Sequence, residues 1–187
     1  MSQSPHQVRR MVMPALGFLL PLAVAASIYG FGRTYTPNYN NALFGAHGTD
    51  TLVLKARMGT ALLGLAVIQV LLGLWMYRRL PGAGVAPRQV RTSHRIIGLG
   101  AFLLSLPIAF HCLTTYGFQV TNTRVALHSI AGCVFYGAFV AKVLVVRARR
   151  LPGWALPVAG GTLVCAIALL WYTAALWVLN GYTVPGL

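Results

Sequence analysis

Two histidines, His111 and His128, flank a short turn-like segment at equal distances. His111 lies six residues before Gly117, and His128 lies six residues after Asn122. Residues 117–122 (GFQVTN) predict a turn, so the flanking helices are expected to be antiparallel neighbours. With a rise of about 1.5 Å per residue, both imidazoles would lie about 9 Å from the same membrane surface. Two facing imidazoles at one depth suit the axial positions of a haem iron, so this spacing favours a haem clamped between the two helices.

Three residues near His128 share one face of the helix expected over residues 124–146. At helical spacing these are Arg124, Gly132 and Phe135. We expect Arg124 to bind a haem propionate, Gly132 to leave room for the porphyrin edge, and Phe135 to flank the ring. The alternative is that His128 hydrogen-bonds a neighbouring helix, while Gly132 only allows close helix packing.

Two further side chains are candidates for the same chemistry. His94 precedes His111 by 17 residues, about 25 Å along a helix. We expect His94 to contribute to an interfacial or quinone site. The alternative is that it binds a second haem, but no partner histidine is found at that depth. Arg57 enters the expected second helix near the depth where propionates would emerge, or it reaches lipid phosphate. For Lys55 we expect the lipid contact.

The composition predicts that these residues lie in a membrane. The chain of 187 residues is 57% hydrophobic, has a mean hydropathy of +0.70 and contains one acidic residue. A soluble domain could not solvate such a surface. Five apolar stretches are long enough to cross about 30 Å of hydrocarbon, which predicts one all-α domain over residues 1–187, a bundle of five transmembrane helices binding haem b. The expected spans are residues 13–30, 52–77, 94–116, 124–146 and 154–179, with an outer loop over 31–51 and Thr92 or Ser93 capping the third helix.

The basic residues predict an orientation. The 15 lysines and arginines give a net charge of +14, and all but four of them fall at one end of the expected helices. The exceptions are Arg33, Lys55, Arg57 and Arg124. Because cytoplasmic loops are enriched in lysine and arginine, the N-terminus is expected in the cytoplasm and the C-terminus outside the cell membrane. Attraction to membrane lipid explains these charges better than nucleic-acid binding does.

The three cysteines give no sign of a redox or zinc motif. Cys112, Cys133 and Cys165 all fall within expected helices, and no CxxC pair is present. An odd number of thiols argues against a disulfide framework or a zinc finger, so we expect these residues to serve packing. Cys112 follows His111 and should point about 100° away from it around the helix.

Two short motifs resemble those of cytochrome b561-type proteins. Residues 127–132 (LHSIAG) are similar to the LHSxxG element of that family, and residues 94–98 (HRIIG) are similar to its HxxxG helix starts. The resemblance implies a helical bundle that holds b-type haem through histidines and passes electrons. Members with two haems spread four ligand histidines over four helices, whereas the expected second and fifth helices here have none. The chain is therefore more similar to compact bacterial b-type membrane subunits.

These observations together predict an electron carrier. Two imidazole ligands leave no open position on the iron, which favours outer-sphere electron transfer between a quinone/quinol pool and a partner redox protein. The chain would then be a subunit of an oxidoreductase complex rather than an enzyme alone. The alternative is a cofactor-free membrane anchor or assembly subunit of a larger respiratory complex, with His111 and His128 as interhelical hydrogen-bond partners. A transporter is disfavoured because the only acidic residue, Asp50, falls in an expected loop.

Overall fold

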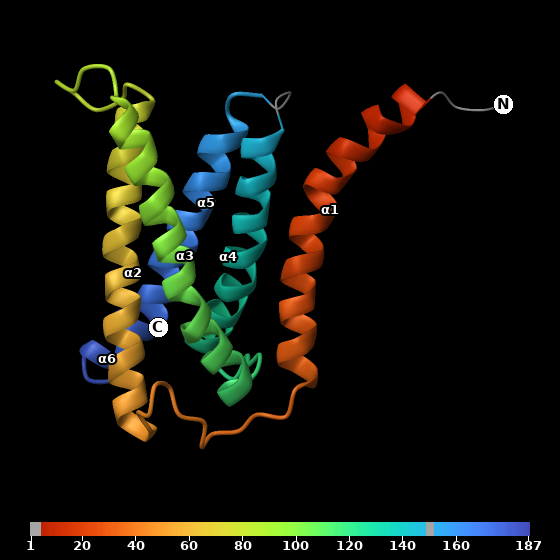
Figure 1. Ribbon diagram of the computed structural model, residues 1–187. Helices are drawn as coiled ribbons and strands as arrows, with labels where there is room; N and C mark the ends of the chain where they lie inside the picture. The colour runs from red at the N-terminus through yellow and green to blue at the C-terminus, as the bar shows by residue number, and fades with distance from the viewer. Residues whose placement is uncertain (1–4, 149–151) are drawn as a thin grey trace.

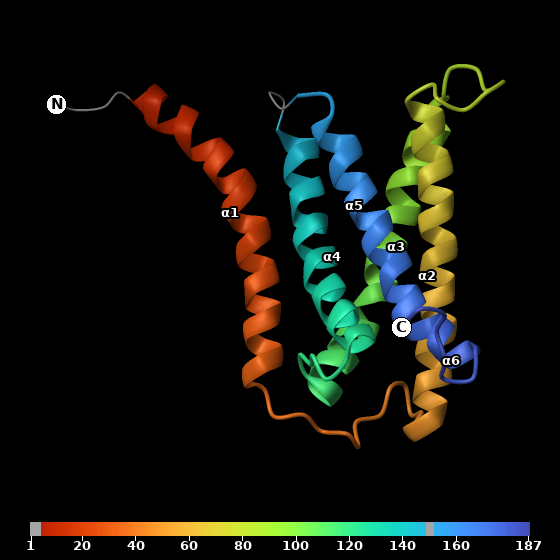
Figure 2. The same cartoon turned by 180° about the vertical axis from the view of Figure 1, so that it is seen from behind.

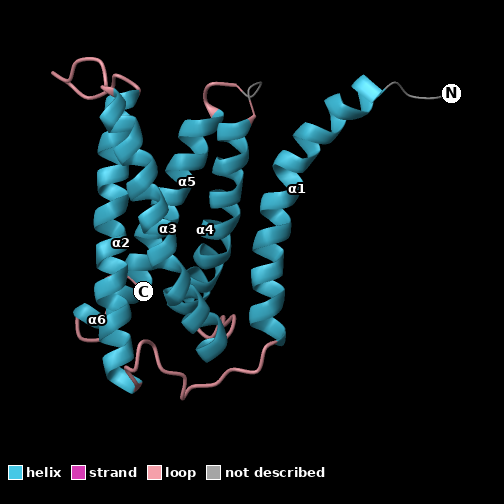
Figure 3. Cartoon of the chain, in the orientation of Figure 1, coloured by secondary structure: helices cyan, strands magenta, loops and turns pink. Residues whose placement is uncertain are grey.

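The structure, a computed structural model, describes residues 5–148 and 152–187, with residues 5–18 described by their backbone only. All secondary-structure elements of the described residues are helices, which confirms the all-α class (Figure 3). In chain order the elements are α1 (Pro5–Thr34), α2 (Gly48–Met76), α3 (Arg88–Tyr116), α4 (Thr123–Arg147), α5 (Ala155–Leu170), the π-helical turn η1 (Trp171–Leu176) and α6 (Trp177–Leu179). Arg149 and Arg150, which the sequence assigns to the basic end of the bundle, lie outside the described residues.

Four of the described helices are long and apolar enough to cross a membrane. They are α2, α3, α4 and the continuous segment Ala155–Leu179. Even the 25-residue segments reach about 37 Å, which exceeds the hydrocarbon thickness. Leucines, valines and isoleucines such as Val67 and Leu71 are exposed on these helices and would contact lipid. The chain is therefore a multi-pass membrane protein. Helix α1 is not among the four, so a fifth span over residues 13–30 stays a prediction.

Three helices begin well before the spans that the sequence predicts; helix α1 starts at Pro5 rather than at residue 13. Helix α3 starts at Arg88 rather than residue 94, and Pro87 is the residue before its first turn. The expected caps are therefore inside the helix, where the Thr92 hydroxyl donates to the carbonyl of Arg88 at 3.3 Å. Helix α2 starts at Gly48, so Asp50 lies in its first turn and not in a loop. The reason is that these helices continue through polar residues beyond their apolar cores.

The α3–α4 hairpin has the predicted loop. Helix α3 ends at Tyr116 and α4 begins at Thr123. Gly117 has φ +69°, a left-handed conformation that glycine adopts without a Cβ penalty. At the other end of the loop, the Asn122 side chain accepts a hydrogen bond from the backbone nitrogen of Val125 at 2.9 Å and caps α4. The chain therefore reverses direction within six residues, as expected.

The two helices of this hairpin are antiparallel neighbours that meet through side chains, and their backbones pack less closely than those of other helix pairs. The closest pairs are α4 with α5, α1 with α4, and α2 with α3. Figures 1 and 2 show the first part of α1 leaning away from the other helices. Near mid-height, side chains bridge α3 and α4: Phe102 stacks on Phe139 with ring centroids 4.0 Å apart. The Tyr136 hydroxyl lies 3.1 Å from that of Ser105. Between this bridge and the 117–122 loop, side chains of both helices line a cavity.

Candidate cofactor-binding site

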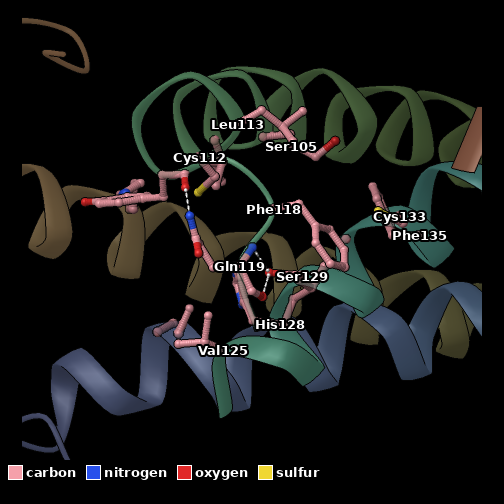
Figure 4. Close-up of a pocket in the computed structure, with 18 of the residues that line it drawn as sticks. Ser105, Cys112, Leu113, Phe118, Gln119, Val125, His128, Ser129, Cys133 and Phe135 are labelled. Carbon is pink, nitrogen blue, oxygen red and sulfur yellow. Dashed lines mark hydrogen bonds between the residues drawn. The ribbon is translucent and has the colours of Figure 1, made fainter. Parts of the chain in front are cut away.

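A cavity of about 490 Å³ lies between the α2–α3 pair and the α4–α5 pair, beside the 117–122 loop. Its walls are mostly apolar and aromatic, as in Figure 4. The charged or ionisable nitrogen groups that line it belong to Lys55, Arg124 and His128, and no acidic side chain lines it. The cavity can therefore hold a large apolar ligand that carries a negative charge at one edge.

His128 lies at the cavity wall with one ring nitrogen already engaged. Its Nδ1 lies 3.0 Å from the hydroxyl oxygen of Thr173 on η1. That hydroxyl donates its only proton to the carbonyl of Leu169 at 2.7 Å, so its oxygen accepts from Nδ1–H of the imidazole. Among the described residues, Nε2 of His128 makes no hydrogen bond. Its lone pair is therefore available to a metal-centred ligand in the cavity.

Arg124 lies one turn before His128 and is held by two contacts. Its guanidinium donates to the carbonyl of Thr173 at 2.8 Å. The guanidinium carbon also lies 3.9 Å from the centroid of the Trp177 ring, a cation–π distance. Arg124 lines the cavity, so a fixed positive charge faces its interior.

Gly132 and Phe135 line the same cavity as His128 and Arg124. A Cβ at Gly132 would meet no atom within 4 Å, so the cavity reaches the α4 backbone there. Phe135 is 4% exposed and packs edge-to-face on Tyr136, with ring centroids 5.0 Å apart. The structure thus brings together the four residues that the sequence placed on one helix face. Their roles toward a haem stay predictions.

The structure does not bring His111 into this cavity. The imidazole is 3% exposed, and its Nε2–H donates to the backbone carbonyl of Asn41 at 3.1 Å. Its Nδ1 lies 3.3 Å from the hydroxyl of Thr115 and 3.5 Å from the ammonium nitrogen of Lys55. His111 therefore connects α3 to the 35–47 loop and to α2. The sequence predicts that the imidazoles of His111 and His128 face each other, but only His128 lines the cavity between the helices.

The face of α3 that lines the cavity carries Ile108, Cys112 and Tyr116. These residues recur every four positions and share one face of α3. His111 directly precedes Cys112, so its side chain points away from this face. Cys112 was assigned to packing, but Figure 4 shows it at the cavity, across from the α4 wall that carries His128. All three cysteines of the chain are free thiols.

Lys55 rather than Arg57 reaches the cavity from α2. Lys55 lines it, and its ammonium nitrogen lies 4.5 Å from the Tyr116 ring centroid. Arg57 is exposed and does not line the cavity. Two positions along a helix differ by about 200°, so the two side chains face opposite directions. The sequence favours Arg57 by its depth and its guanidinium, with lipid phosphate as the alternative partner, because nothing in the sequence fixes the rotation of α2.

His94 lies on α3 near the other end of the bundle, outside this cavity. Its carbonyl accepts a hydrogen bond from the side-chain amide of Gln69 on α2 at 2.7 Å. Two buried atoms of this pair, Nδ1 of His94 and Oε1 of Gln69, have no hydrogen-bond partner among the described residues. The contact between α2 and α3 at this pair is therefore polar, and its hydrogen-bonding capacity is not fully used.

Sequence reasoning missed Thr173 and Trp177 entirely. Both come from the segment where α5 widens into the π-helical turn, and such turns often occur at functional sites. Within the described ranges, no group of three histidine, cysteine or acidic side chains is placed to hold a metal ion. A porphyrin itself supplies four of the ligands of its iron, so one or two protein ligands suffice for haem.

Comparison with known proteins places the whole membrane bundle in one family. Residues 11–186 match the family of unknown function DUF6529. No curated protein and no solved structure matches the chain. Because the match covers nearly all of the sequence, the chain belongs to the DUF6529 family.

Proposed function

We propose that this protein is a membrane b-type cytochrome that holds haem b in the cavity through Nε2 of His128. It would relay electrons between a quinone/quinol pool and a partner redox protein. The observation that carries the proposal is the His128 imidazole at an apolar cavity, with Nδ1 bonded to Thr173 and Nε2 without a hydrogen bond among the described residues. The bound haem would supply a one-electron carrier.

The rest of the cavity suits this cofactor. Its volume of about 490 Å³ falls within the range of roughly 300–1,000 Å³ that is usual for small-molecule and cofactor sites. Arg124 and Lys55 supply two positive charges for the two propionates, and no acidic lining residue competes for them. Gly132 leaves open the wall nearest to His128. Apolar side chains would exclude water from the ring.

The second axial ligand in this proposal is His111, as the sequence predicts. In the structure its Nε2–H donates to the backbone carbonyl of Asn41, so His111 would have to leave that carbonyl in order to hold the haem with His128. Its neighbours Lys55 and Tyr116 both line the cavity, so His111 would have to pass these two side chains to reach it. Cys112 offers another donor atom from the same helix.

The spectrum of the purified protein tests the proposal. Protein produced with ample haem should show the reduced-minus-oxidised absorption bands of haem b, and a short-chain quinol should reduce it. The His47→Ala variant should keep the same bands, because His47 is an exposed loop histidine outside the cavity. Colourless wild-type protein that is folded and helical would contradict the proposal.

We propose the cell membrane as the location, with the N-terminus in the cytoplasm. Helix termini rich in basic residues, such as those at Arg88 and Arg147, lie at the same end of the bundle as the start of α1 (Figure 1). A cysteine replacing exposed Tyr39 should react with a membrane-impermeant thiol reagent in intact cells, and one replacing exposed Val85 should react only after lysis. The reverse pattern would invert the orientation.

A second candidate is a cofactor-free anchor or assembly subunit of a larger complex. It is favoured by one observation, that both ring nitrogens of His111 already have partners. A buried imidazole that is satisfied in this way needs no metal. This candidate predicts colourless protein whose removal prevents a partner complex from assembling.

A further inference from the structure

We infer that Thr173 is a positioning residue that presents the Nε2 lone pair of His128 to the cavity; this inference rests on the proposed function. Thr173 lies in η1 and is 0% exposed. Its hydroxyl oxygen is 2.7 Å from the carbonyl of Leu169 and 3.4 Å from that of Leu170. Both carbonyls can only accept, so the hydroxyl proton points toward them.

The direction of this hydrogen bond decides which tautomer His128 adopts. Because the Thr173 proton is used, its oxygen can only accept, and Nδ1 of His128 at 3.0 Å must carry the hydrogen. A neutral imidazole has one N–H, so Nε2 keeps a free lone pair. If Thr173 donated instead, Nε2 would carry the hydrogen and could not bind a metal. The threonine therefore fixes both the tautomer and the plane of the ring.

The same residue also positions the cation beside the histidine. The carbonyl of Thr173 accepts the hydrogen bond of the Arg124 guanidinium at 2.8 Å. Trp177, the first residue of α6 directly after this turn, contacts the same guanidinium, with its ring centroid 3.9 Å from the guanidinium carbon. In the π-helical turn, Thr173 therefore contacts both Arg124 and His128, which lie four positions apart on α4. His128, which would hold the haem iron, and Arg124, which would pair with a propionate, are thereby fixed relative to each other.

A hydrogen bond from Nδ1–H to an oxygen makes an imidazole a stronger donor to the metal it binds. A stronger donor stabilises the ferric state relative to the ferrous state. Loss of the Thr173 oxygen should therefore weaken haem retention by about 10–100-fold, as is typical for such partners of metal ligands. It should also raise the reduction midpoint potential of the haem that remains.

The Thr173→Val variant removes the oxygen and keeps the side-chain shape, while Thr173→Ser restores it. Thr162→Val is the matched control, because the partly exposed Thr162 makes the same bond to the carbonyl four residues earlier, at 3.0 Å. The first measurement is ¹⁵N NMR of the histidines in haem-free protein, with His128→Gln to assign the signal. Wild type, Thr173→Ser and Thr162→Val should show Nδ1–H at His128, and Thr173→Val should lose this preference.

The second measurement is the midpoint potential of haem-loaded protein, which should rise in Thr173→Val alone. An unchanged His128 tautomer in folded Thr173→Val would overturn the inference, whether or not haem binds. If Thr173→Val does not fold, Nε2–H at His128 in the wild type would overturn it. Wild-type protein that has the Nδ1–H tautomer and binds no haem would instead overturn the proposed function and leave the role of Thr173 standing.

Discussion

The ammonium nitrogen of Lys55 lies 3.5 Å from Nδ1 of His111, so a partly buried contact joins α2 to α3 beside the cavity. Lys55 lines the cavity and His111 does not. A negatively charged ligand edge entering the cavity would compete with the imidazole for this ammonium group. Release of His111 and binding of the ligand are therefore expected to be coupled.

The His111→Ala variant tests whether His111 becomes a ligand. It should keep haem on His128 but convert a six-coordinate, low-spin haem into a five-coordinate, high-spin one. It should also lower the free energy of unfolding by about 1–3 kcal/mol, because Asn41 and Lys55 lose a buried hydrogen-bond partner. Absorption and electron paramagnetic resonance spectra report the spin state. An unchanged low-spin spectrum would assign the second position to another donor, with Cys112→Ser as the next variant.

Substitution of the cavity cations should weaken haem binding without changing the ligand. In Arg124→Gln and Lys55→Gln, each propionate loses a charged partner, so haem should dissociate about tenfold faster or more from each. Arg57→Gln is the matched control because Arg57 is exposed and outside the cavity. Transfer of haem to excess apomyoglobin measures the rates. Equal rates in all three variants would argue against propionates at this end of the cavity.

Two glycines of α4 should respond in opposite ways to added side chains. A Cβ at Gly132 meets open space, whereas one at Gly137 would lie 2.9 Å from the Pro21 carbonyl oxygen of α1. Gly132→Leu should therefore keep the fold but exclude haem by filling the cavity. Gly137→Ala should retain the cavity and destabilise the α1–α4 contact by about 1–3 kcal/mol. Haem content and thermal unfolding separate the two effects, and haem bound normally by folded Gly132→Leu would place the cofactor elsewhere.

His94 is predicted to affect reduction rather than haem content. Its Nδ1 is buried without a partner beside Gln69, near the other end of the bundle from His128. In His94→Ala the haem-to-protein ratio should stay constant, while reduction by a short-chain quinol slows several-fold. Reduction by dithionite is the control, because it needs no quinol site. Loss of half the haem would reveal a second haem at this level.

Much of the fold follows from local sequence patterns. Apolar length predicts the helices, and the Gly117 and Asn122 pair predicts the turn between α3 and α4 to the residue. Along α4, helical spacing groups Arg124 with His128, because residues four apart on one helix share a face. These relations depend only on the chain within one helix or one loop. They need no knowledge of neighbouring helices.

The rotation of each helix about its own axis could not be predicted from local sequence patterns. The rotation of α3 brings Cys112 to the cavity and turns His111 toward Asn41, although both lie at nearly the same depth. The rotation of α2 selects Lys55 over Arg57 in the same manner. Thr173 contacts His128 from a π-helical turn that follows α5, and no residue type in the segment specifies such a turn. Packing of whole helices sets these angles.

The haem-to-protein ratio of purified wild type and His128→Ala tests the central claim most directly. The expected result is one haem per wild-type chain and none in His128→Ala, with both proteins equally helical by circular dichroism. Haem bound equally by the two proteins, or absent from both, would contradict the assignment of His128 as the iron ligand.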